Sequence, residues 1–159
     1  MIALPLPGLN FMHRTNFFQY AMSIGTSLGL LSLILPAARD TSEQMILGWE
    51  AFRVSIMMLY GLGECAPCWV IAFAAVSNGL FLLAPFLALR HVSHAKLMCL
   101  GIVSVSALLA GMATPILVSL DSSASITPHV GYYVWLLGYV ALIAGCMHDL
   151  WRDRNRAVA

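Results

Sequence analysis

The sequence predicts an all-α membrane protein in which four transmembrane helices form an antiparallel bundle. The main observation is a set of four apolar stretches, each long enough to cross the ~30 Å hydrocarbon core of a bilayer as a helix. Charged residues make up only 9% of the 159 residues and hydrophobic residues 60%, whereas a soluble domain carries about 25% charged residues. A single transmembrane domain over residues 1–159 is therefore expected, with spans at about residues 17–35, 68–89, 97–118 and 131–148.

The first span is expected to stay in the protein as a retained helix. Its apolar run is longer than the 7–15 residues typical of a cleaved signal peptide. Gly25 and Gly29 lie four residues apart within it. Small residues at this spacing let two helices approach closely in lipid, so both glycines are predicted helix-packing positions.

A further amphipathic helix is expected in the first outer loop, at about residues 43–60. The segment is apolar apart from one thin polar stripe, which suits a helix lying in the membrane interface. Thr41 or Ser42 is placed to cap its start. A re-entrant segment and a helix packed over the mouth of the bundle remain alternatives.

Three residues of this outer helix are predicted to form a recognition element on the outer face. They are Trp49, Glu50 and Arg53. Glu50 and Arg53 are three residues apart, which allows an ion pair on one helical face and lowers the cost of lying near lipid.

The second span carries one polar residue near its middle, Asn78. A polar side chain inside a span is a functional candidate by default, although such an asparagine more often bonds a neighbouring helix. Pro85 in this span and Pro115 in the third are expected to kink their helices, because proline lacks the backbone N–H that a helix needs.

The third and fourth spans contain more small residues, which are predicted to pack helices against one another. These are Ala107, Gly111, Gly138 and Gly145. Packing of the four helices within one bundle would account for these small residues. Alternatively, helix faces that carry small residues but are not used inside the bundle would dock another membrane protein. Gly25, Gly29, Ala107 and Gly111 are the positions predicted to contact a partner.

Aromatic residues mark the start of the fourth span, at Tyr132, Tyr133 and Trp135. An aromatic belt at the membrane interface explains them. The alternative is that these residues and Asn78 hold a quinone or a pigment. Otherwise no cofactor is expected, and the histidines show no spacing that supports a metal site.

The distribution of basic residues predicts that both termini lie in the cytoplasm. Six of them fall at one end of a four-span bundle and only Arg39 and Arg53 at the other. Cytoplasmic ends of spans are enriched in Lys and Arg, so we expect a multi-pass protein of the bacterial inner membrane. The lipid bilayer is an expected partner and nucleic acid is not, because no basic face is large enough to follow phosphates.

The motif Glu64-Cys65-Ala66-Pro67-Cys68 is the only local pattern that could carry chemistry. Its C-x-x-C spacing places two thiols within disulfide reach, and a helix amino terminus favours a reactive thiolate. Cys65 and Cys68 are thus an alternative redox pair, or a structural disulfide. Cys99 and Cys146 fall near the opposite ends of their spans, on the order of 25 Å away, where they could pair with each other but not relay to Cys65.

Two partial resemblances bear on function. The segments GWEAF at residues 48–52 and GYYVW at residues 131–135, with Asn78 between them, are similar to small four-span bacterial inner-membrane proteins that have no assigned activity. The span count and the C-x-x-C resemble the quinone-linked thiol oxidases of the disulfide-bond-formation B and vitamin K epoxide reductase types. That resemblance implies redox roles for Cys65 and Cys68, but those families use a second cysteine pair on the same face, and residues 119–130 contain no cysteine.

The first functional hypothesis is a non-catalytic accessory or assembly subunit of a larger membrane protein complex. The second is a membrane thiol–disulfide oxidoreductase that uses Cys65 and Cys68. The third is an immunity protein that shields the membrane from a toxin, which the small size of the chain permits.

Overall fold

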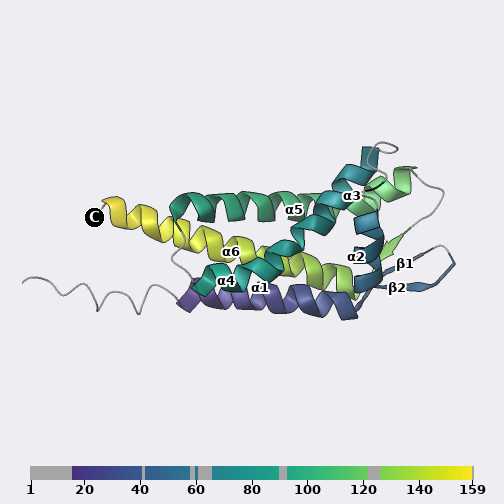
Figure 1. The fold of residues 1–159 in the computed structure, drawn as a ribbon, viewed down its shortest axis with the longest axis horizontal. Coiled ribbons are helices and arrows are strands. Elements are labelled where there is room, and N and C mark those ends of the chain that lie inside the picture. The colour runs from purple at the N-terminus through teal and green to yellow at the C-terminus, as the bar shows by residue number, and fades with distance from the viewer. Residues whose placement is uncertain are drawn as a thin grey trace, which may run out of the picture.

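The computed structural model confirms a helical membrane-protein fold (Figure 1). It describes residues 16–40, 42–57, 60, 66–89, 93–121 and 126–158. Within these residues, four helical segments are long and apolar enough to cross a membrane: Phe17–Ile34, Cys68–Leu89, His94–Leu120 and Val130–Asn155. Motif residue Cys65 and the basic residues Arg14 and Arg90 lie outside the described residues.

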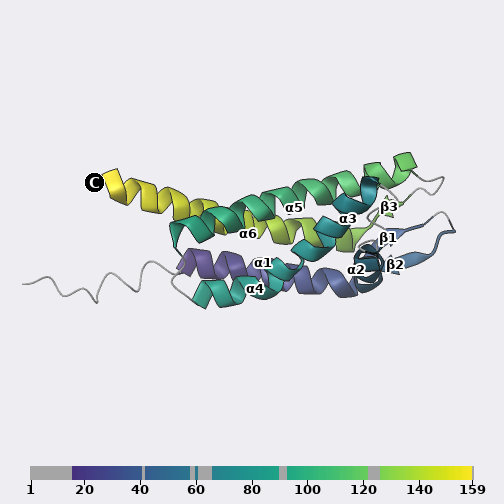
Figure 2. The same cartoon turned by 45° about the horizontal axis from the view of Figure 1, so that its top comes forward.

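The four spans pack side by side, with the second crossing the others obliquely (Figures 1 and 2). Helix α1 (Asn16–Ile34) packs along α6 (Val130–Val158), and α5 (His94–Asp121) packs on the other side of α6. The second span consists of α3 (Ala66–Ser77), which contacts α5, and α4 (Gly79–Leu89), which contacts α1. The start of α1 and the end of α6 lie at the same end of the bundle, as an even number of crossings requires.

Helix α6 extends about ten residues beyond the predicted span, 131–148. Its 29 residues correspond to about 44 Å at 1.5 Å per residue, which exceeds the ~30 Å hydrocarbon core. The extra turns contain Arg152, Asp153 and Arg154. Charged side chains end the apolar run but not the helix, because Arg is a good helix former in water.

The prolines inside α4 and α5 each leave a backbone carbonyl without its usual partner, and a neighbouring helix supplies one. Pro85 cannot donate to the carbonyl of Phe81, and the Thr26 hydroxyl of α1 donates to that oxygen at 3.0 Å. Pro115 cannot donate to the carbonyl of Gly111, and the Tyr132 hydroxyl of α6 donates there, also at 3.0 Å. These bonds tie α4 to α1 and α5 to α6 at the turn where each proline lacks its N–H.

A small structure, which we call the cap, covers one end of the bundle. It consists of strands β1 (Pro36–Arg39), β2 (Met45–Leu47) and β3 (Thr127–Pro128) and helix α2 (Gly48–Met57). The strands form an antiparallel sheet in the order β2-β1-β3. Helix α2 runs across the long helices rather than along them (Figure 2) and contacts α3 and α1.

The outer helix begins at Gly48, so the prediction that it starts near residue 43 is wrong. Residues 45–47 pair with β1 as a strand instead. Of the two expected capping residues, Thr41 lies outside the described residues. Ser42 is occupied in the hairpin turn, where its hydroxyl and backbone N–H donate to the Asp40 carboxylate. These contacts, with a bond from the Gln44 backbone N–H, lower the pKa of Asp40 from its ordinary value.

Two glycines fasten the cap to the bundle through close contact between backbones. A side chain at Gly48 would collide with the carbonyl of Ser32, and the Gly48 N–H donates to the Leu35 carbonyl at 2.9 Å. A Cβ at Gly131 would lie 2.8 Å from the carbonyl oxygen of Pro36. The glycines of the GWEAF and GYYVW segments are therefore explained by packing, because only a residue without a Cβ fits at either position.

The predicted small-residue positions all lie inside the bundle. Gly25 faces Gly138 and Leu142, Gly29 faces Phe81, Gly111 faces Trp135, Gly145 faces Ala21, and Ala107 is fully buried. They are helix-packing positions within this chain. The partner surface assigned to Gly25, Gly29, Ala107 and Gly111 is therefore corrected, because the helices and side chains of the same chain already occupy it.

Candidate functional site

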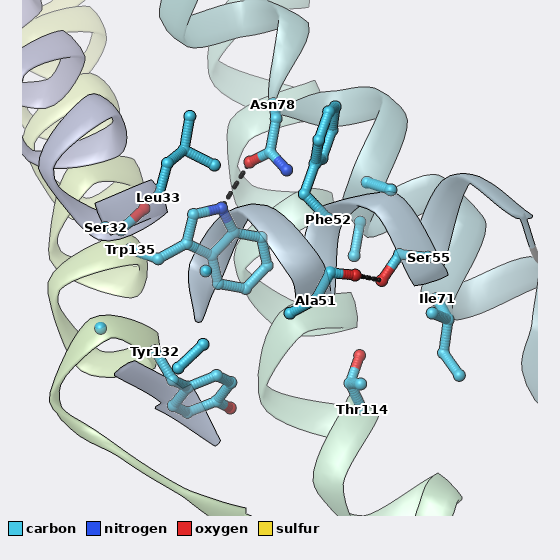
Figure 3. Close-up of a pocket in the computed structure, with 15 residues that line it drawn as sticks. Ser32, Leu33, Ala51, Phe52, Ser55, Ile71, Asn78, Thr114, Tyr132 and Trp135 are labelled. Atoms are coloured by element: carbon cyan, nitrogen blue, oxygen red, sulfur yellow. Dashed lines mark hydrogen bonds between the residues drawn. The ribbon is translucent and has the colours of Figure 1, made fainter. Parts of the chain in front are cut away.

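A cavity of about 130 Å³ lies between the cap and the bundle (Figure 3). Its walls come from α1, β1, α2, α3, α5 and α6, and from Asn78 between α3 and α4. Segments that are distant in sequence thus meet at one place, where the cap closes over the ends of the spans.

The second span is interrupted at Asn78, which belongs to neither α3 nor α4. Its N–H donates to the carbonyl of Ala75, and its carbonyl accepts from the N–H of Phe81, both at 3.0 Å. These are three-residue bonds, tighter than the four-residue bonds of an α-helix. Asparagine followed by Gly79 favours such a break because both are weak helix formers. In membranes, interrupted helices occur where the backbone is buried in protein or lines a cavity.

The Asn78 side chain is held in one orientation by an aromatic network. Trp135 donates its indole N–H to the side-chain oxygen of Asn78, and the Tyr139 hydroxyl lies 3.5 Å from the same oxygen. Tyr139 also lies 2.7 Å from the Ser77 hydroxyl. An indole nitrogen can only donate, so the oxygen of the Asn78 carboxamide must face Trp135. The amide nitrogen then points the other way, as Figure 3 shows.

The hydroxyl groups that line the cavity already donate to backbone carbonyls. The pairs are Ser32 with Gly29, Ser55 with Ala51, Thr114 with Ala110, and Tyr132 with Gly111. By contrast, the side-chain nitrogen of Asn78 has no hydrogen-bond partner among the described residues. The cavity therefore offers the two N–H donors of Asn78 and the lone pairs of the hydroxyl oxygens.

Three of the four predicted ligand candidates meet at this cavity, namely Asn78, Tyr132 and Trp135. Tyr133 does not line the cavity; its side chain is 54% exposed, and its ring stands nearly perpendicular to that of Tyr132. A helix packed over the mouth of the bundle was one alternative for this loop, but no residue of α2 was predicted to line a ligand site. The three- and four-residue spacing of the small residues Gly48, Ala51 and Ser55 could have indicated that one face of this helix covers a cavity.

Helix α2 has two distinct faces. Gly48, Ala51, Phe52 and Ser55 line the cavity, at the three- and four-residue spacing of one helical face. The exposed face contains, in order, Trp49, Arg53, Val54 and Met57.

The predicted recognition residues lie on or beside this exposed face, but their contacts differ from those expected. Glu50 accepts a hydrogen bond from the backbone N–H of Leu47 at 3.0 Å. The Arg53 guanidinium lies over the Trp49 ring, 5.4 Å from its centroid. The expected Glu50–Arg53 ion pair is therefore replaced by a helix-start bond and a cation–π contact.

The described cysteines, Cys68, Cys99 and Cys146, divide between the two ends of the molecule. Cys68, in the first turns of α3, is buried and disulfide-bonded. It lies one helical turn before Ile71, which lines the cavity. Cys99 is an exposed free thiol and Cys146 a buried one, so the pairing considered between them is not formed.

No group of three His, Cys, Asp or Glu side chains gathers as a metal site among the residues that the structure describes. No protein-family model, curated protein or solved structure matches the chain. The resemblances to small four-span proteins and to thiol oxidases therefore stay predictions, and proposals about function rest on the geometry of these residues.

Proposed function

We propose that the protein is a non-catalytic accessory subunit of a larger membrane protein complex, and that it docks through the exposed face of α2. The observation that carries the proposal is the composition of this face, which presents Trp49, Arg53 and Met57 at successive helical turns. Tryptophan, arginine and methionine are enriched in protein interfaces, and tryptophan and arginine are the commonest hot-spot residues.

The position of this face distinguishes it from the sides of the bundle. Exposed apolar side chains along the spans, such as Leu109 and Leu137, are accounted for by lipid. Helix α2 instead crosses the ends of the spans, with Trp49 46% exposed and Met57 57% exposed (Figure 2). The Arg53 guanidinium lies over the Trp49 ring, so the two side chains are already ordered at the ends of the spans. Less side-chain entropy is then lost when a protein partner binds them.

The proposed orientation places the cap outside the bacterial inner membrane and both termini in the cytoplasm. Lys96, Arg152 and Arg154 lie at the end of the bundle opposite the cap, and Arg39 and Arg53 at the cap end. This arrangement supports the orientation under the positive-inside rule.

The test is site-specific photo-cross-linking in intact cells of the source organism, with a benzophenone amino acid at Met57. One discrete cross-linked membrane protein is expected, and its yield should fall at least tenfold when Trp49→Ala or Arg53→Glu is added. The same label at Leu109, on the side of α5, is the matched control and should give lipid adducts alone. Lipid adducts alone at Met57 as well would refute the docking role of α2.

A second candidate function is thiol–disulfide exchange, favoured by the disulfide at Cys68 at the cap end of the molecule. In such a reaction, the disulfide accepts two electrons from a partner dithiol, which itself becomes a disulfide. If the pair is Cys65 with Cys68, the Cys68→Ser variant should accumulate a mixed disulfide through Cys65. A non-reducing gel without that species removes this candidate.

A further inference from the structure

We infer that the cavity beneath the cap binds a neutral single-ring compound whose carbonyl oxygen accepts a hydrogen bond from the side-chain amide of Asn78. This inference goes beyond the accessory role, because it concerns the inner face of α2 and not the exposed face. It rests on the size of the cavity, the chemistry of its walls and its count of free donors.

The size of the cavity matches an occupant with one ring. Its volume is about 130 Å³. For comparison, an engineered apolar cavity of about 150 Å³ takes up benzene. A six-membered ring with a short substituent therefore fits inside it, whereas part of a fused ring system would extend beyond it.

The walls favour a neutral and largely apolar occupant. The lining includes the large apolar side chains of Leu33, Phe52, Ile71 and Trp135, which Figure 3 labels. None of the described residues that line the cavity is charged. A charged ligand would lose its hydration here without gaining a partner charge, so charged compounds are excluded.

The donors of the cavity indicate a carbonyl on the ligand. The hydroxyl groups that line the cavity donate their hydrogens to backbone carbonyls, and Trp135 donates its N–H to the side-chain oxygen of Asn78. The remaining donors are the two N–H groups of Asn78, which the Trp135 bond turns away from the indole. Donors left unpaired among apolar walls are unfavourable, so an acceptor oxygen next to Asn78 relieves that cost.

The experiment compares two probes of the same shape with purified full-length protein in detergent. Acetophenone has the carbonyl, and α-methylstyrene replaces its oxygen with CH₂. Equilibrium dialysis of each labelled probe is corrected with protein-free micelles. Saturable binding of one acetophenone per chain is expected, with α-methylstyrene at least tenfold weaker. The ¹³C resonance of the bound acetophenone carbonyl should also lie downfield of its position in an alkane solvent, because the bound oxygen accepts a hydrogen bond.

Cavity-filling variants locate the binding. Ala51→Phe fills the cavity from α2 without removing a side-chain hydrogen bond and should weaken acetophenone binding at least tenfold. Val54→Phe adds the same ring to the exposed face of α2 and should leave binding unchanged. Ser55→Leu is a second filling variant, and circular dichroism checks that each variant is folded.

Two results overturn the inference. Uptake of acetophenone equal to that of empty micelles, or equal in wild type and both folded filling variants, means that the cavity binds no such ring. Equal affinity for the two probes means that Asn78 donates to no ligand carbonyl. Neither result depends on a partner protein, so the outcome is independent of the cross-linking test of α2.

Discussion

The hydroxyl of Thr26 should stabilise the protein only because Pro85 leaves the Phe81 carbonyl without its helical hydrogen bond. Thr26→Val removes the hydroxyl and keeps the branched shape of the side chain. The Phe81 carbonyl then has neither a helical N–H nor a side-chain donor. In a Pro85→Ala background the new N–H of residue 85 can bond to the Phe81 carbonyl within α4, so the same threonine change should matter little.

The expected size of the effect follows from the surroundings of the bond. A buried acceptor left unpaired costs roughly 1–3 kcal/mol. Interhelical hydrogen bonds inside a membrane protein average about 0.6 kcal/mol and reach about 1.7 kcal/mol. The Thr26 bond is partly buried, and its acceptor has been freed by a proline, so we expect a loss of about 1 kcal/mol in the wild-type background. Most of that loss should disappear with Pro85→Ala.

A double-mutant cycle measures this coupling, with the free energy of unfolding of the four proteins determined by denaturant titration in mixed micelles. Helicity by circular dichroism is the readout, and Ser23→Ala on an exposed position of α1 is the control for general helix effects. An equal cost of Thr26→Val in both backgrounds would refute the reasoning, because the hydroxyl would then act independently of the proline.

Three further predictions follow from the same contacts. Gly48→Ala should unfold or detach the cap, which amide exchange in β1 would report as a faster rate. Gly79→Ala is the control and should be tolerated, because no atom lies within 4 Å of its added methyl group. Equal exchange rates in the two variants would contradict this prediction. Tyr132→Phe should lower the free energy of unfolding by about 1 kcal/mol, because the Gly111 carbonyl in α5 would then lack a hydrogen-bond donor. An unchanged free energy of unfolding would count against that bond. The lowered pKa of Asp40 means that its stabilisation of the β1–β2 turn is complete above the ordinary value of 3.8 and is lost as the pH falls through the lower folded pKa. The protection of the Gln44 amide, taken relative to its intrinsic exchange rate at each pH, should therefore fall in acid in wild type but not in Asp40→Asn. An identical acid response in both would exclude Asp40 as the titrating group.

The number and approximate positions of the spans could be predicted from the sequence because they depend on a local property. An apolar run either is or is not long enough to cross a bilayer, and no distant residue alters that length. The same holds for Pro85 and Pro115, whose missing N–H groups disturb a helix wherever it packs. Asn78 could also be singled out, because a polar side chain within a span requires a partner.

The partners themselves were decided only by the tertiary structure. Nothing near Asn78 in the sequence indicates that Trp135 holds its oxygen, and nothing near Gly111 indicates that Tyr132 supplies the donor that Pro115 withholds. The sheet of the cap was missed for the same reason, because β2 is a strand only through its pairing with β1. Length, hydropathy and the loss of a hydrogen-bond donor can be read from a local segment, whereas a cavity or a hydrogen bond between helices exists only after separate segments have packed together.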